Sequence, residues 1–568
     1  MPLLHPFLGA LVLSLPLAGV AQAQTDTPPP ILPLPDPTEP TRPVPLDPPI
    51  PDPDPPEVPL QVPDQPQPDP PIVPPELEET RFPIERIEVI GNTVLADDIA
   101  ALVQPLEGQD LTLNQLLDLR TAITDLYINS GYVTSGAFLP SGQDLSDGVV
   151  QIQVVEGSLE TIQVNGLSRL RQGYVRDRIA LATHPPLNIP RLEDALRLLQ
   201  IDPLLDRVDA ELTAGSRPGQ NLLILDLAEA DPFSLALTAD NSRSVSIGSI
   251  QGEAQLLHQN LLGFGDAASV RYGLTEGLNL YELRYSVPLN ARDGTLQMRY
   301  ENADSRIVTP QFVDAGIRSD SRTIGFSLRQ PLSRSINQEF ALGLALDLRE
   351  SRSFILDDIP FSFSIGPENG VARVTALRFS QDWLTRDIRR VVAARSQFSL
   401  GLDLFNATVN DTGTDGRFFS WLGQFQWVEQ VSPRWLLVSR VNAQLTPNSL
   451  LPLERFSVGG VDTVRGYAQN QLVTDNAVVG SVELRVPLSA NVNELQLIPF
   501  LDIGTGWNNQ TETPNPSVLL GTGLGVQWQP IPMANLRLAY GIPLINVPNR
   551  GGSWQENGVY FSVTMQPF

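Results

Sequence analysis

Few residues in this chain are of the types that carry out catalysis or bind metals. The 568-residue sequence contains no cysteine and three histidines, His5, His184 and His258, which lie in different regions. The lack of cysteine excludes thiolate metal sites, cysteine nucleophiles and a disulfide framework. A G-x-S-x-G nucleophile elbow and a G-x-x-x-x-G-K-S/T phosphate loop are both missing from the sequence. The sequence therefore predicts no enzyme, no catalytic residue, no metal site and no cofactor.

One arginine stands in an unusual context. The stretch Leu453–Asn470 interrupts a region that otherwise reads as strand after strand. It contains two motifs, Gly459-Gly460 and Val464-Arg465-Gly466-Tyr467. Glycine allows tight turns and positive φ, so the backbone here can pack closely against other groups. An isolated motif of this kind also fits an exposed loop with an incidental charge, so its context in the chain must decide.

The charge balance excludes some partners. The formal net charge is -26, and every basic residue is an arginine. Binding to nucleic acid needs a basic surface, so no nucleic-acid partner is expected. The same argument disfavours a surface that binds anionic lipid.

The N-terminal part of the chain predicts export. The apolar run Phe7–Val20 precedes Ala21-Gln22-Ala23, so residues 1–23 resemble a secretory signal peptide. Residues 24–80 are rich in Pro and Asp, which predicts a disordered tether without helix or sheet. The tether is either a spacer that crosses a periplasmic layer or recruits a partner, or a linker without a sequence-specific role. No later segment has the roughly 20 apolar residues of a membrane-spanning helix, so membrane insertion would need a β-barrel or a surface anchor.

Two similar α+β units are predicted at residues 81–157 and 158–231. In each, a short strand is followed by two helices and two more strands, and Ile162–Gly166 corresponds in place to Ile87–Gly91. The predicted helices are Asp97–Val103, Leu113–Asn129, Tyr174–Leu181 and Arg191–Leu199, and the later strands are Tyr132–Leu139, Val149–Val155, Leu205–Leu212 and Leu222–Ala228. These tandem βααββ units, with the hinge Val154-Val155-Glu156-Gly157 between them, resemble POTRA (polypeptide-transport-associated) domains.

Residues 232–568 predict a transmembrane β-barrel. Helical periodicity disappears, and segments of about ten alternating apolar and polar residues are separated by Gly, Asn, Asp and Pro. An even number of such segments is what a closed antiparallel barrel requires. Sixteen strands are predicted to begin near Phe233, Ile250, Ala267, Leu278, Gly294, Arg322, Phe340, Val371, Ala394, Phe418, Trp435, Ala477, Glu494, Val518, Ala534 and Gly558. Aromatic residues near strand ends fit an interfacial girdle, namely Phe418, Phe419, Trp421, Trp427, Trp435 and Trp507.

Two POTRA-like units followed by a sixteen-stranded barrel resemble the polypeptide-transporting barrel superfamily. More narrowly, the chain is similar to the outer-membrane transporters of two-partner secretion, which export haemolysins and filamentous adhesins. Three motifs carry the resemblance, Val464-Arg465-Gly466-Tyr467, Phe500-Leu501-Asp502-Ile503-Gly504 and the turn Asn260–Asp266. The first falls between predicted strands eleven and twelve, and Asp502 falls on strand thirteen, as in that family.

The resemblance implies a loop, residues 453–470, that folds into the barrel lumen. Arg465 would pair with Asp502 of the wall and hold the loop in place. Gly459, Gly460 and Gly466 would let its backbone approach the wall, and Val464, Tyr467, Phe500 and Gly504 complete the loop and wall motifs. Family members often carry an N-terminal helix that plugs the barrel, but the proline content of residues 24–80 predicts none here.

The resemblance also implies the partners and the location. The barrel would lie in the outer membrane, in contact with its lipid bilayer, and the POTRA-like units in the periplasm. Those units, residues 81–231, would bind an unfolded secreted exoprotein at the edge of a sheet, for example along Tyr132–Leu139. The terminal aromatic Phe568 resembles the tag by which outer-membrane assembly machinery recognises barrels for insertion. Three alternatives remain: an outer-membrane protein assembly factor of the same superfamily, a passive porin-like channel and a cell-surface adhesin.

Overall fold

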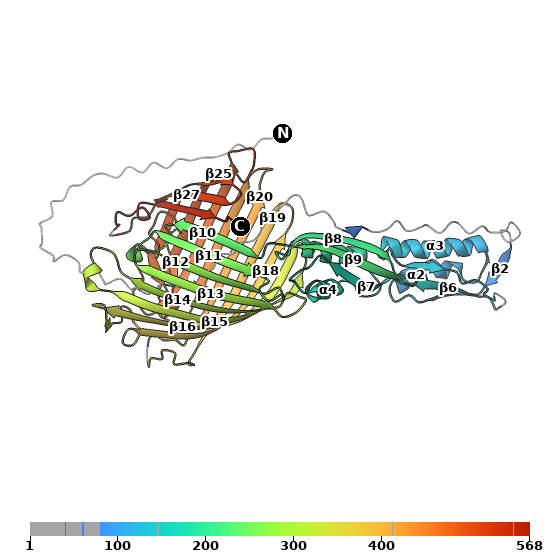
Figure 1. Cartoon of the computed structure of the whole chain (residues 1–568), viewed down its shortest axis with the longest axis horizontal. Helices are drawn as coiled ribbons and strands as arrows, with labels where there is room; N and C mark the ends of the chain where they lie inside the picture. The colour runs from blue at the N-terminus through green and yellow to red at the C-terminus, as the bar shows by residue number, and fades with distance from the viewer. Residues whose placement is uncertain are drawn as a thin grey trace, which may run out of the picture. The chain divides into compact units, whose positions relative to one another are not determined.

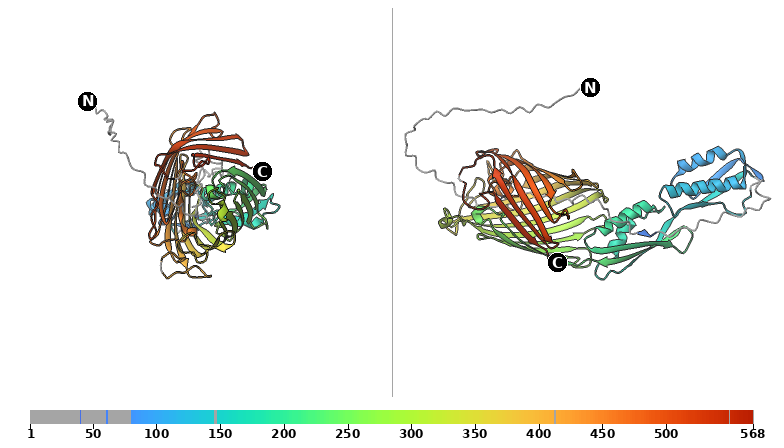
Figure 2. Two further views of the ribbon diagram at one scale, coloured as in Figure 1. Left: turned by 90° about the vertical axis from the view of Figure 1, so that its left-hand side faces the viewer. Right: turned by 90° about the horizontal axis from the view of Figure 1, so that it is seen from above.

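The computed structural model describes residues 40, 60–61, 80–144, 147–411, 413–548 and 550–567. The predicted signal peptide, most of the predicted tether, including any plug helix, and Phe568 lie outside these ranges. Figure 1 shows two α/β units and a closed barrel, and Figure 2 shows the ring of barrel strands from two further directions. None of the helices among the described residues is both long and apolar enough to cross a membrane.

The first unit has two helices packed on a three-stranded sheet. Helices α2 (Ala96–Val103) and α3 (Leu113–Asn129) lie between strand β3 (Arg86–Ile90) and strands β5 (Gly136–Phe138) and β6 (Val149–Val155) in sequence. The spatial order is β3-β6-β5, with β3 parallel and β5 antiparallel to β6. Apolar residues on one face of α3 bury against the sheet, as helical spacing predicts. A ribbon of β2 (Arg81–Ile84) and β4 (Gln109–Thr112), not predicted, also belongs to this unit.

The second unit has the same topology. Helices α4 (Gln172–Ala180) and α5 (Ile189–Gln200) follow β7 (Ser158–Asn165) and precede β8 (Leu205–Ala214) and β9 (Gln220–Glu229). Strand β7 is parallel and β8 antiparallel to β9, as β3 and β5 are to β6. The predicted βααββ fold class is therefore confirmed in both units.

One hydrogen-bonded carboxylate contact is repeated in both units. Glu156, which follows β6, accepts hydrogen bonds from the Thr93 amide (2.7 Å) and hydroxyl (2.6 Å), the Val94 amide (3.3 Å) and the Tyr127 hydroxyl (2.8 Å). Glu229, the last residue of β9, accepts from the amides of Ser168, Arg169 and Leu170 at 2.7–2.9 Å. Each carboxylate thus ties the end of the last strand to the turn after the first, so the duplication extends to individual interactions.

The prediction for the strand Tyr132–Leu139 is wrong in extent, since only Gly136–Phe138 form β5. The Tyr132 amide bonds to the Tyr127 carbonyl, and the Ser135 amide bonds to the Tyr132 carbonyl, so these residues form a turn that ends α3. Gly131 has φ of 87° at this turn, which favours glycine. Alternation of apolar residues did not reveal the turn.

The prediction that the proline-rich segment forms no sheet is wrong at one point. Leu60–Gln61 forms strand β1, which adds in parallel to the edge of β8 with Leu60 opposite Ala210 and Gln61 opposite Glu211. The sheet of the second unit therefore has the order β1-β8-β9-β7. Leu60 also packs against the apolar core of that unit. Proline at positions 59 and 63 brackets the three residues that retain an amide donor, which keeps the added strand short.

The predicted sixteen-stranded antiparallel barrel is confirmed. Its strands are β10 (Phe233–Asp240), β11 (Gln251–Gln259), β12 (Ala267–Leu274), β13 (Leu278–Pro288), β14 (Thr295–Arg306), β15 (Arg318–Arg334), β16 (Gln338–Ile355), β18 (Val371–Arg386), β19 (Arg390–Leu402), β20 (Phe419–Gln430), β21 (Leu436–Leu445), β24 (Asn476–Pro487), β25 (Leu495–Trp507), β26 (Val518–Ile531), β27 (Ala534–Pro543) and β28 (Val559–Met565). The two-residue β17 (Ile359–Pro360) extends the pairing of β16 beyond these. Pairing of β10 with β28 closes the ring, so the backbone of the wall has no open edge.

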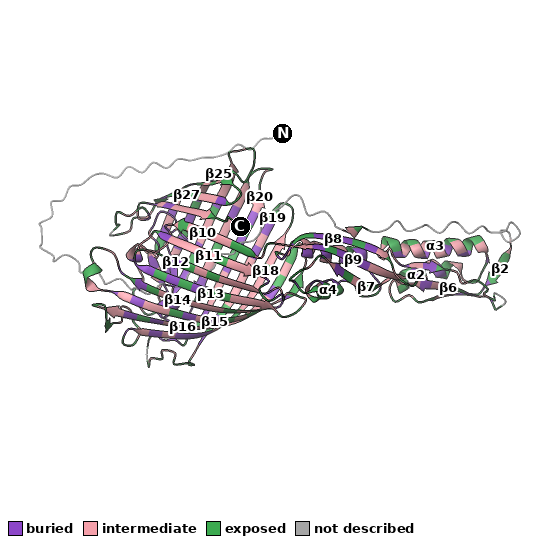
Figure 3. Cartoon of the chain, in the orientation of Figure 1, coloured by how far each residue is buried: buried purple, intermediate pink, exposed green. Residues whose placement is uncertain are grey.

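The two faces of the wall differ as a membrane barrel requires. Along β25, Asp502 is buried on the inner face, whereas Leu501 and Ile503 are 51% and 52% exposed on the outer face. Figure 3 shows this alternation of buried and exposed residues along the barrel strands. Apolar side chains exposed on the outer face match a lipid environment. One aromatic departs from the predicted girdle, because Phe418 is buried against Leu450, Leu451 and Leu453.

The connection from β21 to β24, residues 446–475, is the lumenal loop of this barrel. It was predicted as an irregular loop, but it contains the 3-10 turn η4 (Pro452–Glu454) and a hairpin of β22 (Phe456–Val458) and β23 (Leu472–Thr474). Phe456, Val458, Val464, Tyr467 and Leu472 of the loop form an apolar cluster with inward residues of β24 and β26. The loop is therefore a folded element packed on the inside of the wall.

We predict that the carboxylates Glu156 and Glu229 stabilise their units in a pH-dependent way. Burial raises the pKa of Glu156, but the hydrogen bonds from Thr93, Tyr127 and Val94 outweigh it and lower the pKa below its ordinary value of 4.5. Backbone and side-chain hydrogen bonds likewise lower the pKa of Glu229 against the effect of burial. The stabilisation is therefore present above pH 4.5 and is lost as the pH falls through the lowered pKa.

Glu156→Gln should remove this pH dependence in the first unit and leave it in the second, which serves as the internal control. We expect a loss of about 1–2 kcal/mol in the first unit, because a charge-assisted hydrogen-bond set is lost at a half-exposed site. Hydrogen exchange of the amides of residues 93–94 and 168–170 in the whole detergent-solubilised protein would measure it. Equal changes in both units would contradict the assignment.

Candidate functional site

The structure brings Arg465 and Asp502 together inside the barrel. The Arg465 Nε and Nη2 atoms donate to the two carboxylate oxygens of Asp502, each at 2.7 Å, and the Arg465 amide donates to the same carboxylate at 3.1 Å. Asp502 is fully buried and Arg465 is 7% exposed. This bidentate geometry fixes the orientation of the guanidinium as well as its position.

Phe500 and Ser481 complete the surroundings of this pair. The Arg465 guanidinium carbon lies 3.5 Å from the centroid of the Phe500 ring, in a cation–π contact. The Ser481 hydroxyl donates to Asp502 at 2.7 Å and accepts from Arg465 at 3.3 Å. The wall thus presents an acid, a hydroxyl and an aromatic face to one arginine.

A second carboxylate, Glu483, was missed by the sequence analysis. It lies on β24 and accepts from Arg465 Nη1 at 2.7 Å, while its other oxygen lies 3.5 Å from Arg440 Nη1. The only local signal was its place among Val479, Ser481 and Arg485 at alternating positions of one strand. That signal marks an inward-facing residue but not its partner. We call Arg465, Asp502, Glu483, Ser481 and Phe500 the tip cluster.

Glycines of the wall make room for the tip of the loop. A Cβ atom on Gly504 would lie 2.6 Å from a methyl group of Val458 and 2.8 Å from one of Val464. A Cβ atom on Gly521 of β26 would overlap the Arg465 carbonyl, and one on Gly541 of β27 would overlap the backbone around Gly466. Of these glycines, Gly504 was the one predicted. Together they form a shallow surface on which the backbone of the loop rests.

Gly466 and Tyr467 attach the loop to β26, to β28 and to the residues at the end of β27. Gly466 has φ of 101°, and a Cβ atom there would lie 2.8 Å from the Pro543 nitrogen, so no other residue fits without strain. The Gly466 amide donates to the Tyr560 hydroxyl at 2.8 Å, and that hydroxyl donates to the Tyr467 carbonyl at 2.6 Å. The Tyr467 hydroxyl lies 2.9 Å from the carbonyl oxygens of Leu520 and Ile545. Gly459 and Gly460, with φ of 106° and 102°, form the turn after β22.

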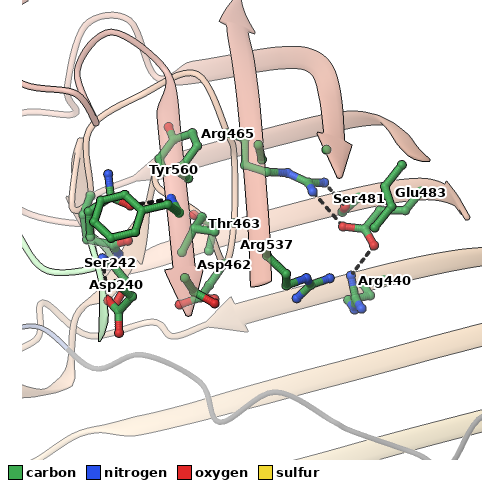
Figure 4. Close-up of a pocket in the computed structure, with 18 of the residues that line it drawn as sticks. Asp240, Ser242, Arg440, Asp462, Thr463, Arg465, Ser481, Glu483, Arg537 and Tyr560 are labelled. Carbon is green, nitrogen blue, oxygen red and sulfur yellow. Dashed lines mark hydrogen bonds and ion pairs between the residues drawn. The ribbon is translucent and has the colours of Figure 1, made fainter. Parts of the chain in front are cut away.

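A cavity of about 600 Å³ lies beside the tip cluster. Figure 4 shows Arg440, Arg465, Arg537 and Glu483 on one side of it and Asp240, Asp462 and Tyr560 on the other. The cavity is lined by charged and polar groups of both signs, which suits passage of a polar, hydrated chain better than binding of one apolar ligand. Within the described part of the chain, no three His, Asp or Glu side chains are grouped so as to hold a metal ion.

The loop has a further ionic contact that the sequence analysis also missed. Glu454 of η4 accepts from Arg349 of β16 at 3.0 Å and from Arg378 of β18 at 2.8 and 3.0 Å. Arg378 Nε also donates to Asp347 at 2.7 Å. We call Glu454, Arg349, Arg378 and Asp347 the limb cluster. The loop is thus held at two separate places on the wall.

A closed barrel with an inward-folded loop and two βααββ units ahead of it defines the class of polypeptide-transporting outer-membrane barrels. The chain belongs to the haemolysin secretion/activation protein family ShlB/FhaC/HecB, whose family model matches residues 219–528. A model of the ShlB-type POTRA domain matches residues 82–157. The chain is therefore an outer-membrane transporter of the two-partner secretion type, with its POTRA units in the periplasm.

Several characterised proteins are similar over most of their length. The outer membrane transporter CdiB of Escherichia coli is 26% identical over 78% of this chain and 76% of that protein. The heme/hemopexin transporter protein HuxB of Haemophilus influenzae is 22% identical over 71% of this chain and 72% of that protein. An outer membrane protein assembly factor, BamA of Nitratidesulfovibrio vulgaris, is 22% identical but matched over 56% of its length. Similarity to the assembly factors is thus weaker than similarity to the transporters.

Solved structures support the same fold. The structure of CdiB from Escherichia coli superposes with a TM-score of 0.66, covering 87% of this chain and 93% of the other at 24% identity. The structure of CdiB from Acinetobacter baumannii gives a TM-score of 0.61 at 19% identity, covering 86% and 90% of the two chains. The passive porin alternative does not account for the POTRA units.

We predict that Gly521→Ala displaces the tip of the loop from the wall. The added methyl group would overlap the Arg465 carbonyl, and overpacking of this kind costs about 1–3 kcal/mol. Ion conductance through the protein in planar bilayers should rise several-fold relative to the unaltered protein. Gly525→Ala, on the same strand, is the matched control, since its Cβ would meet no atom closer than 3.5 Å. Equal conductance of both variants would contradict close packing of the loop on Gly521.

Proposed function

We propose that this chain moves a large unfolded exoprotein across the outer membrane, and that the tip cluster keeps the lumenal loop in a defined closed position between transport events. The observation that carries the proposal is the buried pairing of Arg465 with Asp502 and Glu483 on the inside of the barrel. A buried charge needs partners, so the loop is strongly held while they remain. A polar chain in the lumen offers carboxylates and amides that compete for the same guanidinium.

The POTRA units are proposed to receive the exoprotein as an extended segment. Strand β5 stands at one edge of the first sheet, and β8 stands next to the added strand β1 in the second. The parallel pairing of Leu60 and Gln61 with β8 supports this mode, since it is an instance of an extended segment adding to that edge. Backbone pairing accepts many sequences, which suits a partner that has not yet folded.

No phosphate-binding loop is present in the sequence, so the proposed transport draws on another source of energy. Folding of the exoprotein outside the cell would make its return unfavourable and bias the movement outward. Insertion of the barrel itself is proposed to depend on the outer-membrane assembly machinery.

Arg465→Ala should abolish export while the barrel still inserts. Removal of one partner from a buried pair costs roughly 3–5 kcal/mol and leaves Asp502 and Glu483 uncompensated, so the closed position of the loop is lost. The measurement is secretion of a co-expressed exoprotein of the two-partner secretion type, with heat-dependent gel mobility to report the folded barrel. Arg389→Ala, an exposed arginine in the turn before β19, is the control and should export normally. Unchanged export by Arg465→Ala would refute the role of the tip cluster.

We also predict that Leu60→Asp frees the edge of β8. The Leu60 side chain packs on the core of the second unit, whereas that of Gln61 is exposed, so Gln61→Asp adds the same charge without loss of packing. Amides of Ala210 and Glu211 should exchange several-fold faster in Leu60→Asp alone. An unfolded fragment of the exported protein should then bind that variant more tightly. Identical exchange in the two variants would show that β1 does not cover the edge.

A further inference from the structure

The ascending limb of the lumenal loop, residues 449–455, is attached to a different part of the wall from the tip. Strands β16 and β18 are the seventh and eighth of the barrel, whereas β24 and β25, which hold the tip, are the twelfth and thirteenth. The limb cluster and the tip cluster share no residue. The loop therefore crosses the lumen between two attachment sites.

Glu454 is the centre of the limb attachment. It is 4% exposed, and its two carboxylate oxygens receive the Arg378 guanidinium at 2.8 and 3.0 Å and Arg349 at 3.0 Å. Arg349 also donates to the backbone carbonyl of the preceding residue, Leu453. Arg378 is in turn held by Asp347 at 2.7 Å and by Ser399 at 2.9 Å, so its position does not depend on the loop.

Apolar contacts reinforce the same attachment. Leu450, Leu451 and Leu453 are at most 3% exposed and pack on small inward residues of β18. These wall residues are Ala372, Val374 and Ala376, and Phe418 closes the cluster. The Leu450 amide donates to Asp475 at the other end of the loop at 2.9 Å, which ties the two ends together. The Ser449 and Thr414 hydroxyls, 2.6 Å apart, join the limb to the connection between β19 and β20.

We propose that Glu454 is a positioning residue that fixes the limb to the wall independently of the tip, so that the tip moves during transport about a limb that stays in place. The proposal rests on the proposed function, in that it concerns how the loop opens. It assigns the moving part of the loop to the tip, whose contacts are with strands on one side of the barrel. The limb then acts as a fixed hinge point on β16 and β18.

Thiol labelling can separate the two attachments, because the natural chain has no cysteine to interfere. Ser449→Cys reports on the limb and Thr463→Cys on the tip, since both residues are buried, at 3% and 7% exposure. In whole protein reconstituted into liposomes, Glu454→Gln should raise the rate at which a membrane-impermeant maleimide labels position 449 by at least about tenfold. The rate at position 463 should stay within about twofold. Arg465→Ala should do the reverse.

The control is Glu368→Gln, which removes an exposed carboxylate and should change neither rate. If both probes respond in both variants, the loop moves as one body and the proposal is wrong. Labelling needs no transport, so this result is independent of whether Arg465→Ala still exports, which tests the proposed function. Glu454→Asp, which keeps the charge, should restore part of the protection at position 449.

A disulfide provides a second test that does not require a destabilised limb. Thr414→Cys with Ser449→Cys would place two sulfur atoms where the hydroxyls are 2.6 Å apart, and oxidation would attach the limb covalently. If the limb stays in place during transport, export by the oxidised protein should remain within about twofold of that by the reduced protein. Loss of export on oxidation and its recovery with a reductant would overturn the proposal. Each single-cysteine variant under the same oxidant is the control.

Discussion

The structure depends on the burial of one guanidinium group. A charge taken out of water in a closed lumen is unfavourable unless it is paired and hydrogen-bonded, and Arg465 meets that condition through two carboxylates, a hydroxyl and an aromatic face. The pairing is possible because Gly504, Gly521 and Gly541 have no side chains, so the backbone of the loop can approach the wall closely. Electrostatic pairing and close backbone packing therefore need each other: the glycines bring the loop to the wall, and the carboxylates make that approach favourable. Arginine suits this position better than lysine would, because its planar fork satisfies Asp502 and Glu483 at the same time.

The carboxylates of the barrel wall and those of the POTRA units are satisfied in different ways. In the POTRA units the carboxylates Glu156 and Glu229 are satisfied by amides and hydroxyls of their own unit, so they stabilise a turn within one domain. In the barrel the carboxylates face arginines of other elements, so they set the position of one element relative to another. The first arrangement is rigid by construction, whereas the second can exchange one anionic partner for another. This difference fits POTRA units that keep their shape and a barrel lumen whose occupant changes during transport.

The positions of the sixteen strands could be predicted because two-residue alternation and turn residues are local signals, and each predicted start lies within four residues of the observed one. The contact of Arg465 with Asp502 followed from the likeness of two motifs to a family, not from periodicity. Glu483 was missed because an inward carboxylate between apolar neighbours looks the same wherever its partner lies. Glu454 was missed because nothing in the loop sequence indicates its arginine partners on distant strands. The hairpin of β22 and β23 and the strand β1 were missed for a related reason, because both are short and depend on surfaces formed by distant parts of the chain. The proline residues do keep β1 short, but the prediction that they exclude any strand was wrong.

Strand length adds a geometric consequence. Strand β16 has 18 residues, whereas β10 and β12 have 8 each. At a rise of about 3.3 Å per residue and a tilt of about 40°, β16 reaches roughly 45 Å along the barrel axis, well beyond a hydrocarbon core of about 30 Å. A fully extended polypeptide needs about 13 residues to span that height. A segment in transit would thus lie beside the long strands of the wall for about a dozen residues at a time. This length limits the sequence patterns that an exported chain can present to the lumen at once.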